Sequence, residues 1–227
     1  MMKNQHFSIE ETHVRPLAEK YFIEIGKLNM DEPRDCSMLE AAKRFRDANA
    51  HHIQLQGLFR FFDADFANQL HFDYLSQIPQ EAIEGVYCYM LTAGEICSEA
   101  SIDIMEQIYL DMWGTSYIET GVSYLTEEYI RKEMKERFGE GVSLSPSFGP
   151  GYFGMPVEEM KFFFTVLDGA EIGVALTDSG VMVPQKSCVG FYLVYNRGDI
   201  QVDSSCKTCL GNAGGCMFCS IRREKQG

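Results

Sequence analysis

Residues 176–195, LTDSGVMVPQKSCVGFYLVY, decide the predicted fold. The segments SGVMVP and SCVGFYLVY are rich in β-branched and aromatic residues and meet at a turn around Pro184-Gln185-Lys186, so they predict two strands. A third strand is predicted over residues 83–94, IEGVYCYMLTAG, which have the same character and end at a glycine.

Helical patterns occupy most of the chain before the last two strands. Apolar residues at helical spacing predict helices over residues 12–30, 37–61, 99–113 and 115–138. In the second of these, Ser37 and Glu40 have the spacing of a capping box. Its apolar positions are Leu39, Ala42, Phe45 and Ala48. Helices with one strand, followed by further strands, predict an α/β (α+β) fold with a mixed or antiparallel sheet that helices cover.

Composition limits the class of protein. The chain has 227 residues, 45% of them hydrophobic, which is enough for a sizeable core, and its net charge is −13. This charge argues against partners such as nucleic acid or an anionic membrane, and it would suit docking onto a basic face of another protein. No stretch approaches the roughly 18 uninterrupted apolar residues of a membrane helix, and the opening MMKNQHFSIEETH has no apolar signal core. We expect a cytoplasmic protein whose thiols are reduced or bound to metal.

The loop PGYFGMP, residues 150–156, is the first candidate binding site. Glycine lets the backbone approach a ligand closely, and Tyr152 offers a flat apolar face with a polar tip, which would suit a nucleoside-sized ligand. The loop is not a P-loop, because no GKS or GKT follows it and Glu158 and Glu159 would repel phosphate. The alternative is a surface loop whose glycines and prolines only set turns.

The second candidate lies within the stretch quoted first. Ser179, Met182 and Ser187 lie around the turn between the last two predicted strands. Taken alone, this segment also fits a hairpin with polar turn residues.

The two motifs together resemble the activation (reactivation) domain of vitamin B12-dependent methionine synthase, in its stand-alone form. The first, P-G-Y-x-x-x-P, is found at Pro150–Pro156, and the second, L-T-[DE]-S-x-x-M-x-P-x-x-S-x-x-G, at Leu176–Gly190. Further upstream, Asp111, Gly114 and Glu119 occupy positions that match the stand-alone relatives. The resemblance covers roughly residues 83–195.

The resemblance implies a twisted, mainly antiparallel sheet flanked by helices. It divides the chain into an N-terminal helical region of the same domain (1–80), an activation-like core (81–203) and a short Cys-rich tail (204–227). It implies that S-adenosylmethionine (AdoMet) is bound, with Glu119 facing the ammonium of its methionyl end. The alternative for Glu119 is a solvated carboxylate on a helix. The other implied AdoMet-binding residues are Pro150, Gly151, Tyr152, Phe153, Ser179, Met182 and Ser187.

Ser147 departs from the family pattern. The family has an arginine three positions before the proline of P-G-Y, where a guanidinium can hold the AdoMet carboxylate in a bidentate pair. Here that position is a serine, and Lys186 or Arg131 could substitute for the missing cation.

Four of the eight cysteines crowd into the tail as C-x-x-C-x6-C-x-x-C. Each pair would place two thiolates on one tight turn, so the pattern predicts a metal site. A [4Fe–4S] cluster, zinc, and free or disulfide-linked thiols are the alternatives, and the redox context of the family favours the cluster. The predicted ligands are Cys206, Cys209, Cys216 and Cys219. The scattered cysteines are predicted to be core residues, Cys188 near the ligand; they are Cys36, Cys88, Cys97 and Cys188.

The function that the resemblance implies is that of a stand-alone reactivation protein for a cobalamin-dependent methyltransferase. It would bind AdoMet and assist reductive methylation of cob(II)alamin on a separate cobalamin-binding methyltransferase subunit, with a flavodoxin or ferredoxin as electron donor. No acid or base is expected, since methyl transfer to Co(I) needs only in-line approach. One alternative is an Fe–S electron-transfer activator of a corrinoid protein without AdoMet use. Another is a binding module that keeps the fold and has lost catalysis.

Overall fold

The structure is a computed structural model that describes residues 3–72, 75–76, 78–96, 103–152 and 155–197. The strands are β1 (Gln5–Ile9), β2 (Leu55–Asp63), β3 (Ile83–Thr92), β4 (Ser143–Leu144), β5 (Ala175–Leu176), β6 (Met182–Val183) and β7 (Ser187–Tyr195). The α-helices are α1 (Glu11–Gly26), α2 (Pro33–Asn49), α3 (Ile104–Leu125), α4 (Arg131–Phe138) and α5 (Met160–Val166). A π-helical turn at Thr126–Ile130 joins α3 to α4.

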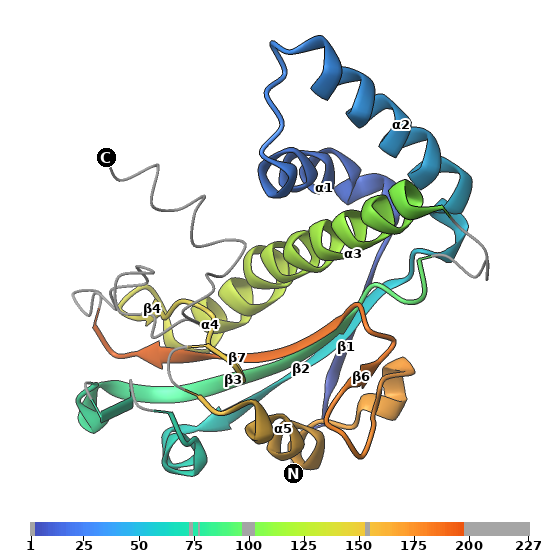
Figure 1. The fold of residues 1–227 in the computed structure, drawn as a ribbon. Helices are drawn as coiled ribbons and strands as arrows, with labels where there is room; N and C mark the ends of the chain where they lie inside the picture. Colours follow the sequence, from blue (N-terminus) through green and yellow to red (C-terminus); the bar gives the residue numbers. More distant parts are fainter. Residues whose placement is uncertain (1–2, 73–74, 77, 97–102, 153–154, 198–227) are drawn as a thin grey trace.

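The main sheet has five strands within the described ranges, in the order β1-β2-β3-β7-β4. Every neighbouring pair in it is antiparallel. Helix α3 lies across one face of the curled sheet with α1 and α2 packed against it, and α5 lies against the other face (Figure 1). The predicted fold class, a twisted antiparallel sheet flanked by helices, is therefore confirmed. β5 and β6 form a separate two-stranded sheet.

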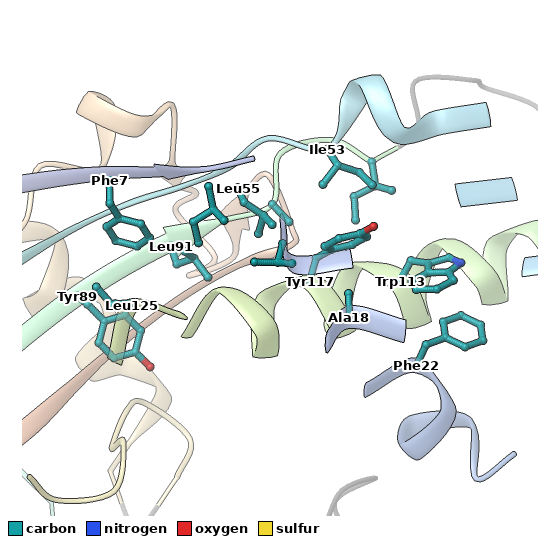
Figure 2. Packing of buried hydrophobic residues seen from close by; sticks show 14 of the residues in the cluster. Phe7, Ala18, Phe22, Ile53, Leu55, Tyr89, Leu91, Trp113, Tyr117 and Leu125 are labelled. Carbon is teal, nitrogen blue, oxygen red and sulfur yellow. The ribbon is translucent and has the colours of Figure 1, made fainter. Parts of the chain in front are cut away.

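The sheet is buried on both faces, which explains the nearly continuous apolar sequence of β3. Tyr87, Tyr89 and Leu91 of β3 belong to the helix-side core, and the alternate residues Val86, Cys88 and Met90 belong to the core on the opposite face. Figure 2 shows the helix-side core, in which α3 contributes Trp113 and Tyr117.

Trp113 joins the three helices of this face. Its ring stacks on Phe22 of α1 with the centroids 4.2 Å apart, and its indole N–H donates to the carbonyl of Ala42 on α2 at 2.9 Å. The side chain is fully buried, so both contacts form away from water. Trp113 therefore anchors α3 against the two N-terminal helices.

The prediction of one helix over residues 37–61 is wrong. The helix α2 begins earlier, at Pro33, because proline at the first helical position needs no N–H donor, and Ser37 donates to the Pro33 carbonyl inside the helix instead of capping it. The helix ends at Asn49, and Ala48 is exposed. Residues 55–63 form β2, a central strand.

Two helices were predicted over residues 99–113 and 115–138, but the boundary between the helices lies further along the chain, after Leu125. A single helix, α3, runs through Gly114 to Leu125, and α4 ends at Phe138 with Gly139 as its C-cap, as the sequence predicted. Gly114 is a contact point for another side chain and not a helix end. At its N-terminus α3 has a capping box, in which Asp103 accepts from the Glu106 amide at 2.9 Å and Glu106 accepts from the Asp103 amide at 3.0 Å.

Two strand assignments also change. The edge strand β1 was not predicted, and it pairs with β2. The predicted strand around Met182 exists as β6, but it pairs with β5 and not with β7. The first eighty residues thus contribute two strands of the main sheet besides α1 and α2. Within the described residues, no helix is long and apolar enough to cross a membrane.

Candidate functional site

The resemblance singled out three residues that lie on α3: Asp111, Gly114 and Glu119. They lie beside the helix-facing residues of β7. Side chains alternate along a strand, so one set of β7 residues faces α3 while Val189, Phe191 and Leu193 enter the opposite core. We call this line of contact the α3–β7 seam. From α3 and the π-helical turn it comprises Asp111, Gly114, Thr115, Glu119 and Thr126, and from β7 and the residue before it, Lys186, Cys188, Gly190 and Tyr192.

An ion pair closes one end of the seam. The Lys186 ammonium lies 2.6 Å from a carboxylate oxygen of Asp111 and 3.4 Å from the hydroxyl of Thr115. The stem of Lys186 passes over Gly114, where a Cβ would come within 2.6 Å of it. A glycine inside a long helix normally lowers helix stability, and here it makes room for the lysine that reaches across from the sheet.

Glu119 and Cys188 occupy the middle of the seam. Both side chains are half-buried. Burial raises the pKa of the Cys188 thiol, and the negative charge of Glu119 raises that pKa further. The thiol therefore stays protonated at neutral pH, and the Glu119 carboxyl group lies close enough to act on it.

Tyr89 connects the seam to the loop that follows β4. In the β3–β7 ladder Tyr89 lies opposite Gly190, and its hydroxyl lies 2.8 Å from the Ser147 hydroxyl. A Cβ at position 190 would lie 2.7 Å from the Tyr89 hydroxyl and 2.7 Å from the Phe148 carbonyl oxygen. Gly190, the last residue of the second motif, is thus required for the phenol to pass over β7.

A second tyrosine forms the other end of the seam. Tyr192 stacks on Tyr89 with ring centroids 5.5 Å apart, and its hydroxyl lies 2.7 Å from the Thr126 hydroxyl in the π-helical turn. Burial raises the pKa of Tyr192 to about 12, and the hydroxyls of Thr126 and Ser147 oppose part of that rise. Single π-helical turns often occur at functional sites.

The Pro150–Pro156 loop lies next to the seam along the edge of β7. It follows Phe148, which pairs with Phe191 of β7. Gly151 has a φ of +86°, a value that favours glycine, and its amide donates to the Met155 carbonyl at 2.9 Å. Tyr152 is 54% exposed, so its ring is accessible to a ligand. Phe153, another predicted binding residue, lies outside the described residues.

The structure does not bring Ser179 and Ser187 to Glu119. Ser179 is exposed in the turn before β6, where its hydroxyl lies 3.0 Å from that of Thr177. Ser187 is buried, with its hydroxyl 2.7 Å from the Pro184 carbonyl and 2.9 Å from the Thr92 hydroxyl. Ser179 bonds within its own turn, as the polar-turn alternative describes, whereas Ser187 bonds both to the turn at Pro184 and to Thr92 of β3. Met182 packs against the core on the face opposite the helices.

The cysteines fall into different environments. Cys88 is in the core, whereas Cys36 and Cys188 are only half-buried, so the prediction of core cysteines holds fully for Cys88 alone among the described ones. Among the described residues, no group of three or more His, Cys, Asp or Glu side chains could hold a metal ion. Cys97 and the four predicted tail ligands lie outside the part of the chain that the structure describes.

A surface hollow of about 420 Å³ lies elsewhere, between α4 and the β1 edge of the sheet. Its lining includes Phe59, Tyr129, Glu133 and Arg137. None of the residues of the α3–β7 seam lines it. The motif residues and this hollow are therefore separate features.

Motif spacing predicted a site of Glu119, Gly190 and the P-G-Y loop, with Lys186 or Arg131 as a replacement cation. It missed Tyr89 and Thr126, because nothing local in the sequence indicates contacts that form across strands.

Comparison with solved structures finds the crystal structure of the MetH reactivation domain bound to AdoHcy. The two share 15% sequence identity with a TM-score of 0.60, over 88% of this chain and 80% of that one. This likeness confirms the resemblance at the level of the fold. No family model and no curated protein matches the chain.

Proposed function

We propose that this protein binds AdoMet, or its demethylated product S-adenosylhomocysteine (AdoHcy), along the α3–β7 seam. It would act as a stand-alone reactivation protein for a cobalamin-dependent methyltransferase. The observation that carries the proposal is that Glu119, Ser147 and Gly190, from three separate segments, are all neighbours of Tyr89. The Ser147 hydroxyl and a Cβ on Gly190 lie within 2.8 Å of the phenol oxygen, and the charge of Glu119 adds to the rise that burial causes in the pKa of Tyr89. These residues lie on the fold of the MetH reactivation domain, whose solved structure is bound to AdoHcy.

The residues present fit such a ligand. Glu119 supplies a half-buried carboxylate for the ammonium of the amino-acid end. Gly149 and Gly190 bring two backbones together, since a Cβ on Gly149 would lie 2.9 Å from the Val189 carbonyl oxygen. The exposed ring of Tyr152 offers a face on which an adenine or ribose can pack.

In this proposal the chain positions the ligand and AdoMet supplies the methyl group. Glu119 orients the amino-acid end, and Tyr89 keeps its neutral hydroxyl on Ser147 because burial raises its pKa well above the usual value. The methyl acceptor is cobalamin on a separate methyltransferase subunit, and a flavodoxin or ferredoxin donates the electron. The net charge of −13 would suit a basic face on that partner.

Calorimetric titration of the full chain with AdoHcy tests the binding step. The wild type is expected to bind, and Glu119→Gln is expected to bind at least about tenfold more weakly, because an amide cannot neutralise the ligand's ammonium. Glu140→Gln is the matched control, since Glu140 pairs with Lys135 on the surface with a side chain 83% exposed. A wild type that does not bind AdoHcy, or a Glu119→Gln variant that binds as tightly as wild type, contradicts the proposal.

The second candidate function is electron transfer to a corrinoid protein without AdoMet use. The observation that favours it is the double C-x-x-C pattern of the tail together with Ser147 in place of the family arginine. In that case the seam would have no methyl donor to bind, and the cluster on Cys206, Cys209, Cys216 and Cys219 would carry the electron. The AdoHcy titration distinguishes the two functions.

A further inference from the structure

Ser147 leaves the proposed ligand without its expected carboxylate partner. Its hydroxyl is engaged by the Tyr89 hydroxyl at 2.8 Å, and a serine carries no charge. A carboxylate leaving water is stabilised by charge-assisted hydrogen bonds, and lysine, arginine or protonated histidine also neutralises its charge. The question is which cation near the seam is placed for this role.

Lys186 contacts the face of α3 that also carries Glu119. Its ammonium is 3.4 Å from the Thr115 hydroxyl. Thr115 precedes Glu119 by four residues, so the two lie about 6 Å apart along the axis of α3 and on the same helix face. Lys186 also shares the helix-facing side of the strand with Cys188, the residue whose thiol feels the charge of Glu119.

Arg131 is less well placed. It follows Glu119 by twelve residues, which corresponds to about 18 Å along a helix axis. Like Lys186 it already pairs with a carboxylate, that of Glu127 at 2.9 Å, so position and exposure separate the two cations. The side chain of Arg131 is 46% exposed, whereas that of Lys186 is 25% exposed. A less exposed cation makes the stronger partner for a carboxylate because solvent screens it less.

We propose that Lys186 binds the carboxylate of the ligand's amino-acid end while Glu119 binds its ammonium. This inference rests on the proposed function and deepens it, because it assigns the two charges of an α-amino acid to two residues of the α3–β7 seam. Asp111 holds the lysine ammonium at this end of the seam until the ligand arrives. The adenosine portion then extends toward the loop that contains Tyr152.

Two thioethers test the assignment by calorimetry on the full chain. AdoHcy carries the amino-acid end, and 5′-methylthioadenosine has the same adenosine thioether without it. Lys186→Met is expected to weaken AdoHcy binding about tenfold or more and to leave methylthioadenosine binding unchanged. Lys186→Arg, which keeps the charge, is expected to retain most of the affinity for AdoHcy.

Lys132→Met is the matched control, because Lys132 also pairs with a carboxylate, that of Glu128 at 2.6 Å, but outside the seam. The inference is wrong if Lys186→Met binds AdoHcy like wild type, if it loses both thioethers equally, or if Arg131→Met selectively loses AdoHcy. In those cases the proposed function stands as long as the wild type binds AdoHcy. If the wild type binds neither thioether, the proposed function and the inference both fail.

Discussion

Gly190 determines the local structure of the seam. Because β7 pairs with β3, any side chain at position 190 would occupy the space through which the Tyr89 phenol reaches Ser147. The same position lies against the Phe148 carbonyl on the other side. Packing therefore explains this glycine of the second motif independently of any ligand.

Gly190→Ala is expected to lower the free energy of unfolding by about 1–3 kcal/mol, as overpacking of a core does. The added Cβ would lie 2.7 Å from a backbone oxygen, which cannot move aside without displacing the loop. Urea denaturation followed by circular dichroism measures the change. Gly141→Ala is the control, since its Cβ would meet nothing within 4 Å. A Gly190→Ala variant as stable as the control would contradict this account.

At the residue scale, motif spacing predicted Glu119 and Gly190 as site positions but not the contacts around them. Tyr89 belongs to a strand nearly sixty residues before Ser147, and only the β3–β7 pairing brings their hydroxyls together. The ion pair of Lys186 with Asp111 spans a similar separation. Contacts of this kind depend on the register of the sheet, which no local pattern reveals.

At the scale of the elements, α3 forms one side of the seam, so the N-terminal cap that stabilises α3 also stabilises the site. Asp103→Ala removes the side-chain acceptor for the Glu106 amide and is expected to lower the free energy of unfolding by about 1 kcal/mol. Asp103→Asn is the control, because asparagine caps helices about as well as aspartate. Urea denaturation of both variants gives the comparison, and equal losses for the two would show that the cap does not act through its acceptor oxygen.

The element boundaries show where sequence patterns are insufficient. Residues 83–94 and the last strand were predicted correctly because β-branched and aromatic residues dominate them. The strand β2 was missed because its apolar residues continue the apolar pattern of α2. Over so few residues the helical and the strand periodicity cannot be distinguished. The edge strand β1 is five residues long, and so short a pattern rarely distinguishes a strand from a loop.

For the whole molecule, the tail remains the largest open prediction. Anaerobically purified full-length protein is expected to contain iron and sulfide with broad visible absorbance, as thiolate-bound clusters do, and replacing Cys206 and Cys209 by serine should remove both. Metal analysis with sulfide determination measures the outcome. Cys36→Ser is the control, because its thiol donates to the Met30 carbonyl at 3.1 Å within the folded domain. One zinc per chain would overturn the cluster assignment, and a metal-free protein would overturn the metal site.

The place of β7 in the sheet has a consequence for biosynthesis. It is the last strand of the described part of the chain, yet it inserts between β3 and β4, and its register pairs Thr92 with Ser187. During synthesis, β3 and α3 leave the ribosome before β7 does, so the apolar surface that β7 covers stays exposed for that time. Chaperones bind exposed surface of this kind. Contacts so distant in sequence also slow folding. A nascent chain therefore acquires the α3–β7 seam only after residue 195 has left the exit tunnel.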